Sequence, residues 1–342
     1  MKRSVYRMPR AGNIHNLTLQ NEELPEPAAD EVQIEVKAVG LNFADIFAMQ
    51  GLYSATPKGS FIPGLEFSGV IVKKGEKVTD RKVGERVMGA TRFGGYVDYI
   101  NHHHLYVQPI PDSWSFEEGA AFTVQGLTAY YALIKLGDIQ PGMNVLIHSA
   151  AGGVGILANR IAKKIGAYTV ATVGQPGKVE YLEKNESYDR IIVRGKNFEE
   201  QLTEALGDRE LNLIMECIGG DVLKAGWAHL APMGRMIAYG SASFTSHSAR
   251  PNKLKLLIKY LRRPRIDPLR LPSENKSIMG FNLIWLYDRV DLMRDMLQGL
   301  INLNIGAQHV GHMFEWEEMH EAIRQFQLGH TSGKVIVKTK AH

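Results

Sequence analysis

The sequence predicts an α/β protein in which a doubly wound parallel sheet is joined to a second, β-rich domain. The first indication is an apolar run at 144–149 that ends in small residues and passes into an amphipathic segment at 156–165. The second is a regular alternation of strand and helix patterns from residue 144 onward, which is typical of repeated βα units. The third is a series of closely spaced short strands within residues 1–124.

The N-terminal part is expected to form a compact barrel-like domain. Residues 32–39 alternate apolar and polar side chains, which is the pattern of a half-buried strand. Further short strands are predicted at 69–72, 86–88, 96–100 and 105–107. Residues 115–118 match a capping box, so a helix is predicted over 117–136, with an interruption near 124–126.

The central part predicts the parallel sheet, whose ligands are expected at the carboxyl ends of the strands. Its strands are predicted at 144–149, 168–174, 190–194, 211–218, 234–240 and 277–281. A helix at 283–302, an acidic helix at 315–328 and a last strand at 334–338 follow, and we expect that strand to return to the first domain. The predicted domains are therefore 1–124 together with 284–342, and 125–283.

The turn between the first parallel strand and its helix predicts a dinucleotide site. The pattern Ala150-x-Gly152-x-x-Gly155 keeps large side chains away, so that backbone N–H groups and the positive helix end can approach a pyrophosphate. The strand before it and the helix after it supply the context that this motif requires. The alternative is an ordinary Gly-rich turn. The backbone expected to contact the cofactor comprises Ser149, Ala151, Gly152, Gly153, Val154 and Gly155.

The end of the second parallel strand predicts NADPH rather than NADH. An NAD site usually has an acidic residue roughly 20 residues beyond the glycine turn. Here Gly174 is followed by Lys178, and Arg194 lies at the end of the third strand. Two cations without a carboxylate suit a 2′-phosphate, although both could instead be exposed surface residues.

Composition excludes several classes of function. A net charge of +4 and a pI near 8.9 are too mild to indicate nucleic-acid binding. The single Cys217 excludes an intrachain disulfide framework and a zinc site made of several thiolates, and we expect it to be a buried strand residue. Because the chain has no apolar stretch of membrane-spanning length, we expect a soluble cytoplasmic protein without stable membrane insertion.

Two stretches have a plain and a functional interpretation. His102, His103 and His104 could suggest a metal, but consecutive strand residues point to opposite faces, so we expect solvated turn residues. Residues 253–263 form a basic amphipathic segment. We favour a solvated helix packed on the sheet, and the alternative is a helix lying on an anionic membrane surface.

Several motifs, taken in order, resemble a known family. They are residues 41–45 (LNFAD), 51–53 (GLY), 63–66 (PGLE), 126–130 (GLTAY) and 149–155 (SAAGGVG). Together they resemble the zinc-independent quinone oxidoreductase branch of the medium-chain dehydrogenase/reductase superfamily. Residues 275–283, which follow a basic helix, are similar to its vesicle amine transport protein-like subgroup. The resemblance covers nearly the whole chain and implies a Rossmann domain joined to a GroES-like catalytic domain.

The resemblance implies that no metal is bound. Where zinc enzymes of the superfamily have a cysteine ligand this chain has Asn42, and where they have Gly-His-Glu it has Gly64-Leu65-Glu66. Without a Lewis acid, reduction of an electron-poor quinone or enone is easier than oxidation of an alcohol, because it needs mainly a positioned hydride and a proton source.

The resemblance also implies the site residues. Asn42 and Tyr53 are expected beside the nicotinamide as the catalytic pair, Asn42 donating a hydrogen bond and Tyr53 a proton. The alternatives are that Tyr53 only lines the pocket while water supplies the proton, and that Asp45 caps a helix. The remaining implied cofactor contacts are Thr128, Tyr239, Gly240, Ser241, Phe281, Leu283 and Lys334, the last closing over the phosphates. Arg194 follows Val193 where many relatives have a tyrosine for the 2′-phosphate, which leaves coenzyme preference open.

The sequence therefore predicts a zinc-independent, NADPH-dependent oxidoreductase that transfers hydride to quinones or α,β-unsaturated carbonyls. One alternative is an enone or alkenal reductase with little quinone activity. Another is a non-catalytic NADPH-binding protein associated with a membrane surface. The resemblance further implies a homodimer joined at the sheet edge near residues 277–281.

Overall fold

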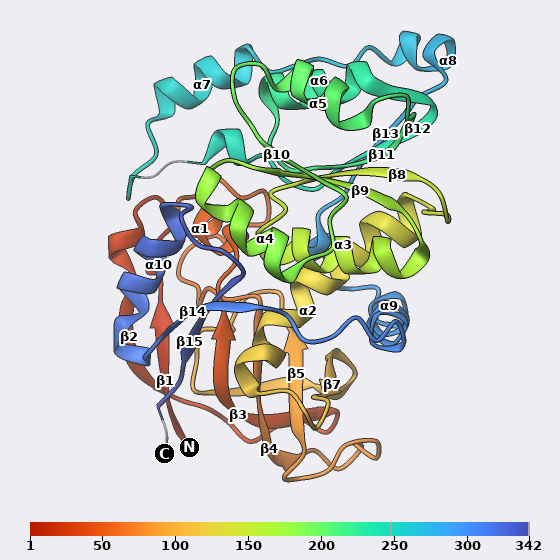
Figure 1. The fold of residues 1–342 in the computed structure, drawn as a ribbon. Helices are drawn as coiled ribbons and strands as arrows, with labels where there is room; N and C mark the ends of the chain where they lie inside the picture. Colours follow the sequence, from red (N-terminus) through yellow and green to blue (C-terminus); the bar gives the residue numbers. More distant parts are fainter. Residues whose placement is uncertain (246–247, 341–342) are drawn as a thin grey trace.

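The computed structural model describes residues 1–245 and 248–340, which form two main sheets with helices between and around them (Figure 1). The six-stranded sheet is entirely parallel, in the order β10-β9-β8-β11-β12-β13. Its strands are β8 (Asn144–His148), β9 (Tyr168–Val173), β10 (Arg190–Val193), β11 (Leu211–Glu216), β12 (Leu230–Ala238) and β13 (Ser277–Gly280). The predicted doubly wound sheet is confirmed.

Helices cover both faces of this sheet, which explains its continuous apolar strands. In Figure 1, α5 (Phe198–Leu206) and α6 (Gly220–His229) lie above it, and α3 (Gly153–Ile165) and α4 (Val179–Asn185) lie below. Val145, Leu146 and Ile147 of β8 are all fully buried. A parallel strand that is buried on both faces reads as an unbroken apolar run, as this one does.

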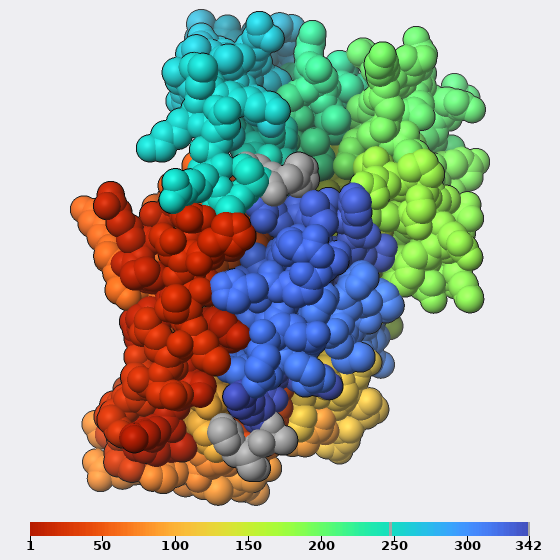
Figure 2. Space-filling view, turned by 90° about the vertical axis from the view of Figure 1, so that its left-hand side faces the viewer, coloured from red at the N-terminus to blue at the C-terminus, as the bar shows by residue number. Residues whose placement is uncertain are grey.

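The second main sheet has the order β14-β15-β3-β4-β5-β7, with β6 paired to β3. Its strands are β3 (Glu31–Gly40), β4 (Glu66–Lys74), β5 (Arg86–Ala90), β6 (Tyr99–His103), β7 (Val107–Pro109), β14 (Val310–Phe314) and β15 (Lys334–Lys338). Strand β15 runs antiparallel to β3, with Val337 opposite Val39, so the predicted return of the chain end is confirmed. Figure 2 shows the C-terminal part (blue) packed against the N-terminal part (red).

One long helix, α2 (Phe116–Tyr130), packs against both parts of the molecule. It contacts β3 and β4 on one side and α3 on the other. The predicted capping box is confirmed, because Glu118 N–H donates to Ser115 Oγ at 3.1 Å and Ser115 N–H to Glu118 Oε2 at 2.7 Å. The predicted boundary at residue 124 lies inside this helix, and the division into 1–124 with 284–342 and 125–283 stays a prediction.

The predicted interruption of this helix near residues 124–126 is wrong. The α-helix continues to Tyr130 and is followed by a π-helical turn, Tyr131–Leu136. Gly126 serves close packing instead, because a Cβ there would be 2.3 Å from Leu300 Cδ2 on helix α9 (Val290–Asn302). A glycine inside a helix therefore marks a helix contact here rather than a break.

Other elements differ from prediction at their boundaries. The strand predicted at 96–100 is shifted to β6, and the one predicted at 105–107 is mostly a 3-10 turn. Within 283–302 only α9 is α-helical, and the acidic helix is α10 (Met319–Gln327). Strands β1 (Lys2–Arg7) and β2 (Thr18–Glu23) were not predicted, because their patterns are mostly polar, and the five-residue strand β14 was not predicted either. The remaining helices are α1 (Phe43–Met49), α7 (Lys253–Leu261) and α8 (Leu271–Glu274), with short 3-10 turns at 14–16, 104–106, 176–178, 242–244, 268–270, 283–286 and 316–318.

The three consecutive histidines are not all solvated. His102 is buried on β6, where its ring contacts Ala90 O at 2.9 Å, and burial lowers its pKa to about 4. Neighbouring His103 is partly exposed, as strand alternation requires, and His104, which begins the 3-10 turn after β6, is also partly exposed. The expectation of a solvated turn is therefore wrong for His102.

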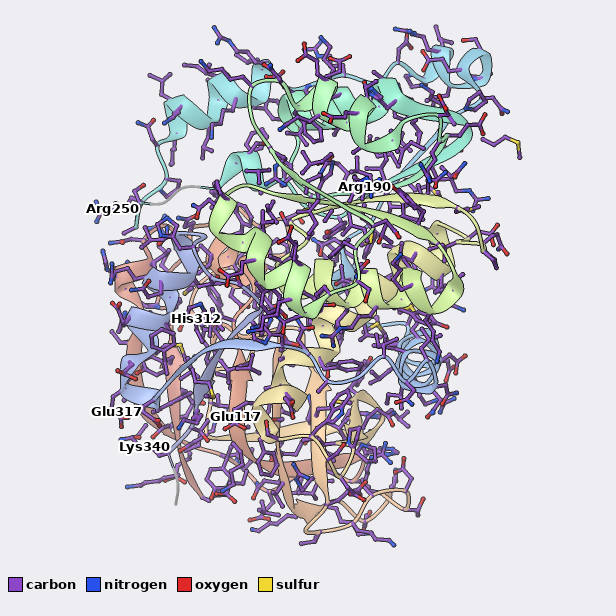
Figure 3. The ribbon with its side chains drawn as sticks, viewed as in Figure 1. Glu117, Arg190, Arg250, His312, Glu317 and Lys340 are labelled. Carbon is purple, nitrogen blue, oxygen red and sulfur yellow. The ribbon has the colours of Figure 1, made fainter. Side chains whose placement is uncertain are left out.

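An ion pair at the periphery connects Lys340 to the 3-10 turn at 316–318. Lys340 Nζ lies 2.7 Å from Glu317 Oε1, and both residues lie at the outer edge of the molecule near the C-terminus (Figure 3). Both side chains are about half exposed, so we assign this pair little stability.

Candidate active site

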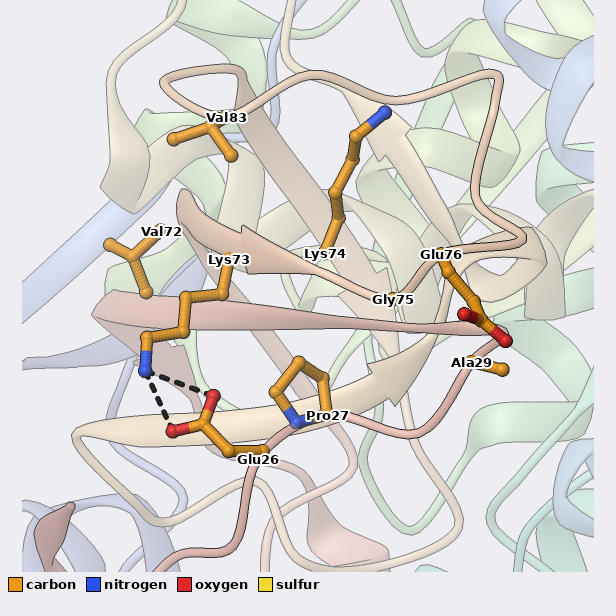
Figure 4. A pocket seen from close by; sticks show the side chains of 9 residues that line it. All are labelled: Glu26, Pro27, Ala29, Val72, Lys73, Lys74, Gly75, Glu76 and Val83. Atoms are coloured by element: carbon orange, nitrogen blue, oxygen red, sulfur yellow. Dashed lines mark hydrogen bonds and ion pairs between the residues drawn. The ribbon is translucent and has the colours of Figure 1, made fainter.

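One large cavity brings together every predicted catalytic and cofactor residue. It has a volume of about 1490 Å³, and its walls come from the glycine turn, the ends of the parallel strands, α1, α2, α7 and the chain after α10. A second hollow of about 580 Å³ lies on the large sheet, where Lys73 Nζ and Glu26 Oε1 approach to 2.8 Å (Figure 4). That hollow contains no predicted site residue, so the large cavity is the candidate site.

The glycine turn shapes one wall. Ser149 adopts a φ of 52°, which is rare for a residue with a side chain and is often found at functional sites. A Cβ on Gly155 would lie 2.6 Å from Ala150 Cα, so packing requires glycine there. A Cβ on Gly152 would meet only Ser149 O, at 3.1 Å. Gly152 is therefore the position that keeps the cavity open in front of α3, whose first N–H groups lack helical partners.

Two partly buried cations lie at the end of β9. Arg194 Nη1 donates to Thr172 Oγ1 at 2.6 Å, and its Nη2 would be 3.2 Å from a Cβ on Gly174. Lys178 Nζ donates to Gly329 O at 2.8 Å, and burial lowers its pKa. Both side chains are half-buried and line the cavity, so the alternative of two exposed surface cations is wrong.

The charge of the cavity wall has one sign. Among the described lining residues, Lys178, Arg194, Lys253 and Lys334 are cationic, and none is Asp, Glu or His. A concave site lined by one sign of charge favours ligands of the other sign. The cavity is therefore suited to an anionic ligand.

Asn42 lines the cavity, and both the nitrogen and the oxygen of its side-chain amide are hydrogen-bonded. Its Nδ2 donates to Gly40 O at 3.2 Å and to Glu66 Oε1 at 2.9 Å. Its Oδ1 accepts from Lys334 Nζ at 2.9 Å and from Gln125 Nε2. Since both N–H groups already have acceptors, the expected hydrogen bond from Asn42 to a ligand has no free donor in this arrangement.

Lys334 forms a buried ion pair in the same network. Its Nζ lies 2.5 Å from Glu66 Oε1, and the two side chains are 3% and 0% exposed. Burial lowers the pKa of Lys334, while the neighbouring Glu66 opposes that shift. Its ammonium therefore contacts Glu66 and Asn42, and the predicted contact with the cofactor phosphates stays a prediction. The preceding residue, Gly333, contacts the glycine turn through its N–H, which donates to Ala151 O at 2.8 Å.

Asp45 has the capping role that was considered for it. Its Oδ2 accepts from the Asn42 backbone N–H at 2.8 Å, just before α1 begins, and from the Tyr96 hydroxyl at 3.0 Å. The side chain is fully buried, and burial raises its pKa to about 7. The capping interpretation is confirmed, and it fixes the segment that carries Asn42.

Tyr53 bridges two sides of the cavity. Its hydroxyl donates to Asn282 Oδ1 at 2.7 Å, and Asn282 closely follows β13 of the parallel sheet. Burial raises the pKa of Tyr53 to about 12, so the hydroxyl keeps its proton at neutral pH. Asn282 was not among the predicted site residues, although it lies inside the motif at 275–283.

Cys217 is not the buried strand residue that was expected. It lies one position beyond the end of β11 and lines the cavity, with Sγ 3.5 Å from Ser149 Oγ. Burial raises the pKa of its thiol, which keeps it protonated and a poor nucleophile. It is a wall residue at the carboxyl end of the sheet.

The remaining predicted residues line the cavity around these groups. They are Thr128, Tyr239, Gly240, Ser241, Phe281 and Leu283. The Thr128 hydroxyl donates to Val124 O at 2.7 Å within α2. Glu66 and Gln125 were missed as network members, because only the fold brings β4 and α2 against Asn42. Within residues 1–245 and 248–340, no three His, Cys, Asp or Glu side chains gather as a metal centre requires.

Comparison with known proteins finds two family domains in the chain. Residues 28–135 match the model of the alcohol dehydrogenase GroES-like domain, and residues 153–282 match that of the zinc-binding dehydrogenase domain. The human synaptic vesicle membrane protein VAT-1 homolog is 32% identical over 316 residues, which cover 92% of this chain and 80% of that protein. The Danio rerio homolog is 31% identical, and the match spans 66% of its length.

Solved structures share the whole fold. The human VAT-1 homolog-like protein superposes with a TM-score of 0.84 at 26% identity, over 100% of this chain and 99% of that one. The quinone oxidoreductase of Thermus thermophilus, solved alone and with NADPH, gives 0.75 at 28% identity, over 98% and 99%. The CurK enoyl reductase gives 0.81 at 28% identity, over 99% of each chain.

Proposed function

This chain belongs to the medium-chain dehydrogenase/reductase superfamily, in the subgroup of the VAT-1 homologues, and we propose that it is a zinc-independent, NADPH-dependent reductase of quinones or α,β-unsaturated carbonyls. The observation that carries the proposal is the cavity wall, which combines an open glycine turn with cations beside Gly174 and has no carboxylate among its described residues. The Thermus thermophilus quinone oxidoreductase, which shares this fold, has been solved with NADPH, and this supports the choice of cofactor.

The residues present fit NADPH. Gly152 to Gly155 would hold the pyrophosphate, because the space in front of Gly152 is open and α3 begins there. Lys178 and Arg194 would hold the 2′-phosphate through charge-assisted hydrogen bonds. Tyr239, Phe281 and their neighbours would enclose the nicotinamide half. NADPH, when bound, supplies a hydride to an electron-poor carbon of the acceptor.

The chain's own residues orient the acceptor and supply a proton. Tyr53 holds its proton at neutral pH and reaches the cavity, so it is our candidate donor to the oxygen on which charge develops. Asn282 Oδ1 orients the Tyr53 hydroxyl until an oxygen of the substrate takes its place as the hydrogen-bond acceptor. Asn42 has a positioning role: its hydrogen bonds with Glu66 and Lys334 hold this part of the cavity wall in place.

The acceptor class rests on chemistry rather than on one residue. No metal is needed to polarise a quinone or an enone, because both are already electron-poor. The two nearest enzyme alternatives are represented among similar structures by a quinone oxidoreductase and by an enoyl reductase. An enone or alkenal reductase with little quinone activity is therefore the alternative enzyme.

Steady-state kinetics test the proposal. The purified chain is assayed with NADPH against a panel of quinones and enals, and NADPH binding is measured separately by fluorescence. We expect turnover of at least one class. Tight NADPH binding without turnover of any acceptor would contradict the proposal, and the ratio of quinone to enal rates decides between the two enzyme alternatives.

A second candidate function is supported by helix α7. Leu254, Leu257, Ile258 and Leu261 are 45–68% exposed on this helix, which also carries three lysines and is followed by two arginines. The expectation that α7 packs on the sheet is therefore wrong, because none of its residues is buried. An amphipathic helix of this composition suits an anionic membrane surface. No described helix is long and apolar enough to cross a bilayer.

Liposome co-sedimentation tests this second function. We expect binding to vesicles that contain anionic lipid, weakened by salt and by Leu254→Ser. Equal recovery with neutral vesicles, or none with either, would leave the reductase as the single proposal.

We further propose a cytoplasmic homodimer joined through β13, which is one of the two edge strands of the parallel sheet. Its mass in solution can be measured by light scattering.

A further inference from the structure

Helix α7 has two apolar faces with different surroundings. Lys253, Leu256, Leu257 and Tyr260 recur at helical spacing and all line the large cavity. Leu254, Ile258 and Leu261 form a neighbouring stripe that is absent from the cavity wall and is 45–68% exposed. Leu257 and Tyr260 of the first group are themselves 52% exposed, so the two groups differ in whether they line the cavity and not in how exposed they are.

The cavity wall near α7 is apolar well beyond the dinucleotide site. Phe43 and Phe47 of α1 and Phe326 of α10 line the same cavity, and the Phe43 and Phe326 rings lie 4.4 Å apart. In Figure 1 α7 lies above α1 and α10, and apolar residues of all three helices line the same cavity. Polar lining residues of these helices are Lys253 on α7 and Gln327 on α10, while Tyr53 and Asn282 come from other segments of the wall.

The size of the cavity leaves room for a second occupant. Ordinary small-molecule sites measure roughly 300–1,000 Å³. The 1490 Å³ here exceeds that range, and its apolar walls continue from the acceptor region around Tyr53 to α7. Transfer of a hydrocarbon chain from water to apolar walls of this kind is favourable by roughly 0.8 kcal/mol for each buried methylene.

We infer that the cavity accepts a substrate with a long hydrocarbon tail, whose tail lies between α7 and the Phe43–Phe326 pair while its electron-poor head reaches Tyr53. This inference rests on the proposed function and names its acceptor class: a lipophilic enal or a quinone with an alkyl tail. Leu256, Leu257 and Tyr260 are then specificity-determining residues. They contact the tail and not the reacting atoms.

A chain-length series tests the inference. The enzyme is assayed with NADPH and a homologous series of trans-2-alkenals, all below their critical micelle concentrations. We expect kcat/KM to rise roughly fourfold for each added methylene until the channel is filled. Leu257→Ala should lower the ratio of kcat/KM for the longest over the shortest alkenal by about tenfold.

Leu254→Ala is the matched control, because it removes the same side chain from the same helix outside the cavity wall. We expect this variant to keep the wild-type ratio. A flat chain-length profile, or equal losses in Leu257→Ala and Leu254→Ala, would overturn the inference. Equal losses would indicate that α7 acts through its outer face.

Calorimetry separates this inference from the proposed function. Long-chain saturated alcohols cannot accept hydride, so their binding to the NADPH complex reports on the channel alone. We expect binding with a negative heat-capacity change, weakened in Leu257→Ala and unchanged in Leu254→Ala. Binding of the alcohols without turnover of any alkenal or quinone would support the tail site and overturn only the reductase. Turnover of short alkenals without alcohol binding would do the reverse.

Discussion

At the scale of single residues, the coenzyme preference rests on Lys178 and Arg194 at the end of β9. Lys178→Ala removes a cation that lines the cavity, so the KM for NADPH should rise at least about tenfold, because a hydrogen bond to a charged group contributes roughly 1.5–3 kcal/mol. The KM for NADH should change little. Lys184→Ala, an exposed lysine on α4, is the control. Equal changes for both coenzymes would remove the phosphate assignment.

The role of the Tyr53 hydroxyl is a second question at this scale. Tyr53→Phe removes a possible proton donor, and we expect kcat to fall about a hundredfold, within the usual range for general acids. Asn282→Ala leaves the hydroxyl and removes only its acceptor at 2.7 Å, so kcat should fall much less. A wild-type kcat in Tyr53→Phe would assign the proton to water and make Tyr53 a wall.

At the scale of elements, we expect different roles for Gly152 and Gly155 of one turn, the first in cofactor binding and the second in packing. Gly152→Val introduces a side chain in front of α3, so NADPH should bind at least about tenfold more weakly, at nearly unchanged stability. Gly155→Ala places a Cβ 2.6 Å from Ala150 Cα, and overpacking of this kind costs about 1–3 kcal/mol of unfolding free energy. Fluorescence titration and urea unfolding of both variants check the contrast. Identical effects would contradict it.

The buried pair between β4 and β15 links elements far apart in sequence. Lys334→Met leaves Glu66 buried without its cation, which should lower the free energy of unfolding by about 3–5 kcal/mol. The double variant Glu66→Gln/Lys334→Met should recover part of that loss, because no unpaired charge remains. Urea unfolding of the single and double variants measures the coupling, and additive losses would argue against a coupled pair.

At the scale of the whole molecule, buried His102 predicts how stability depends on pH. Its pKa is lowered to about 4 from the model-peptide value of 6.5, so the unfolded chain binds the proton more readily. Its contribution is complete above pH 6.5 and is lost as pH falls toward 4. Between pH 7 and pH 5.5 the loss should be about 1 kcal/mol. Because buried His148, whose pKa is lowered to about 3, adds a similar slope, His102→Gln should reduce the slope in this range without abolishing it, and an unchanged slope would exclude a contribution of His102.

The sequence alone determined the features that depend on local pattern. The apolar run of β8 and the small residues after it predicted the strand, the turn and α3, because backbone geometry there depends on neighbouring residues. The alternation after residue 144 predicted the parallel sheet, and the absence of an acidic residue near Gly174 predicted a site suited to a 2′-phosphate. Polar strands such as β2 escaped prediction, because they bury too little to leave a periodic signal.

Only the tertiary structure decided which distant side chains share an environment. Asn42, Glu66, Gln125 and Lys334 come from four separate segments, and their hydrogen bonds join two predicted cofactor contacts, Asn42 and Lys334, in one buried network. The same holds for Tyr53 with Asn282, and for the two faces of α7. Pattern in a sequence reports burial along one element, whereas a contact between elements depends on how their faces pack, and no single element encodes that.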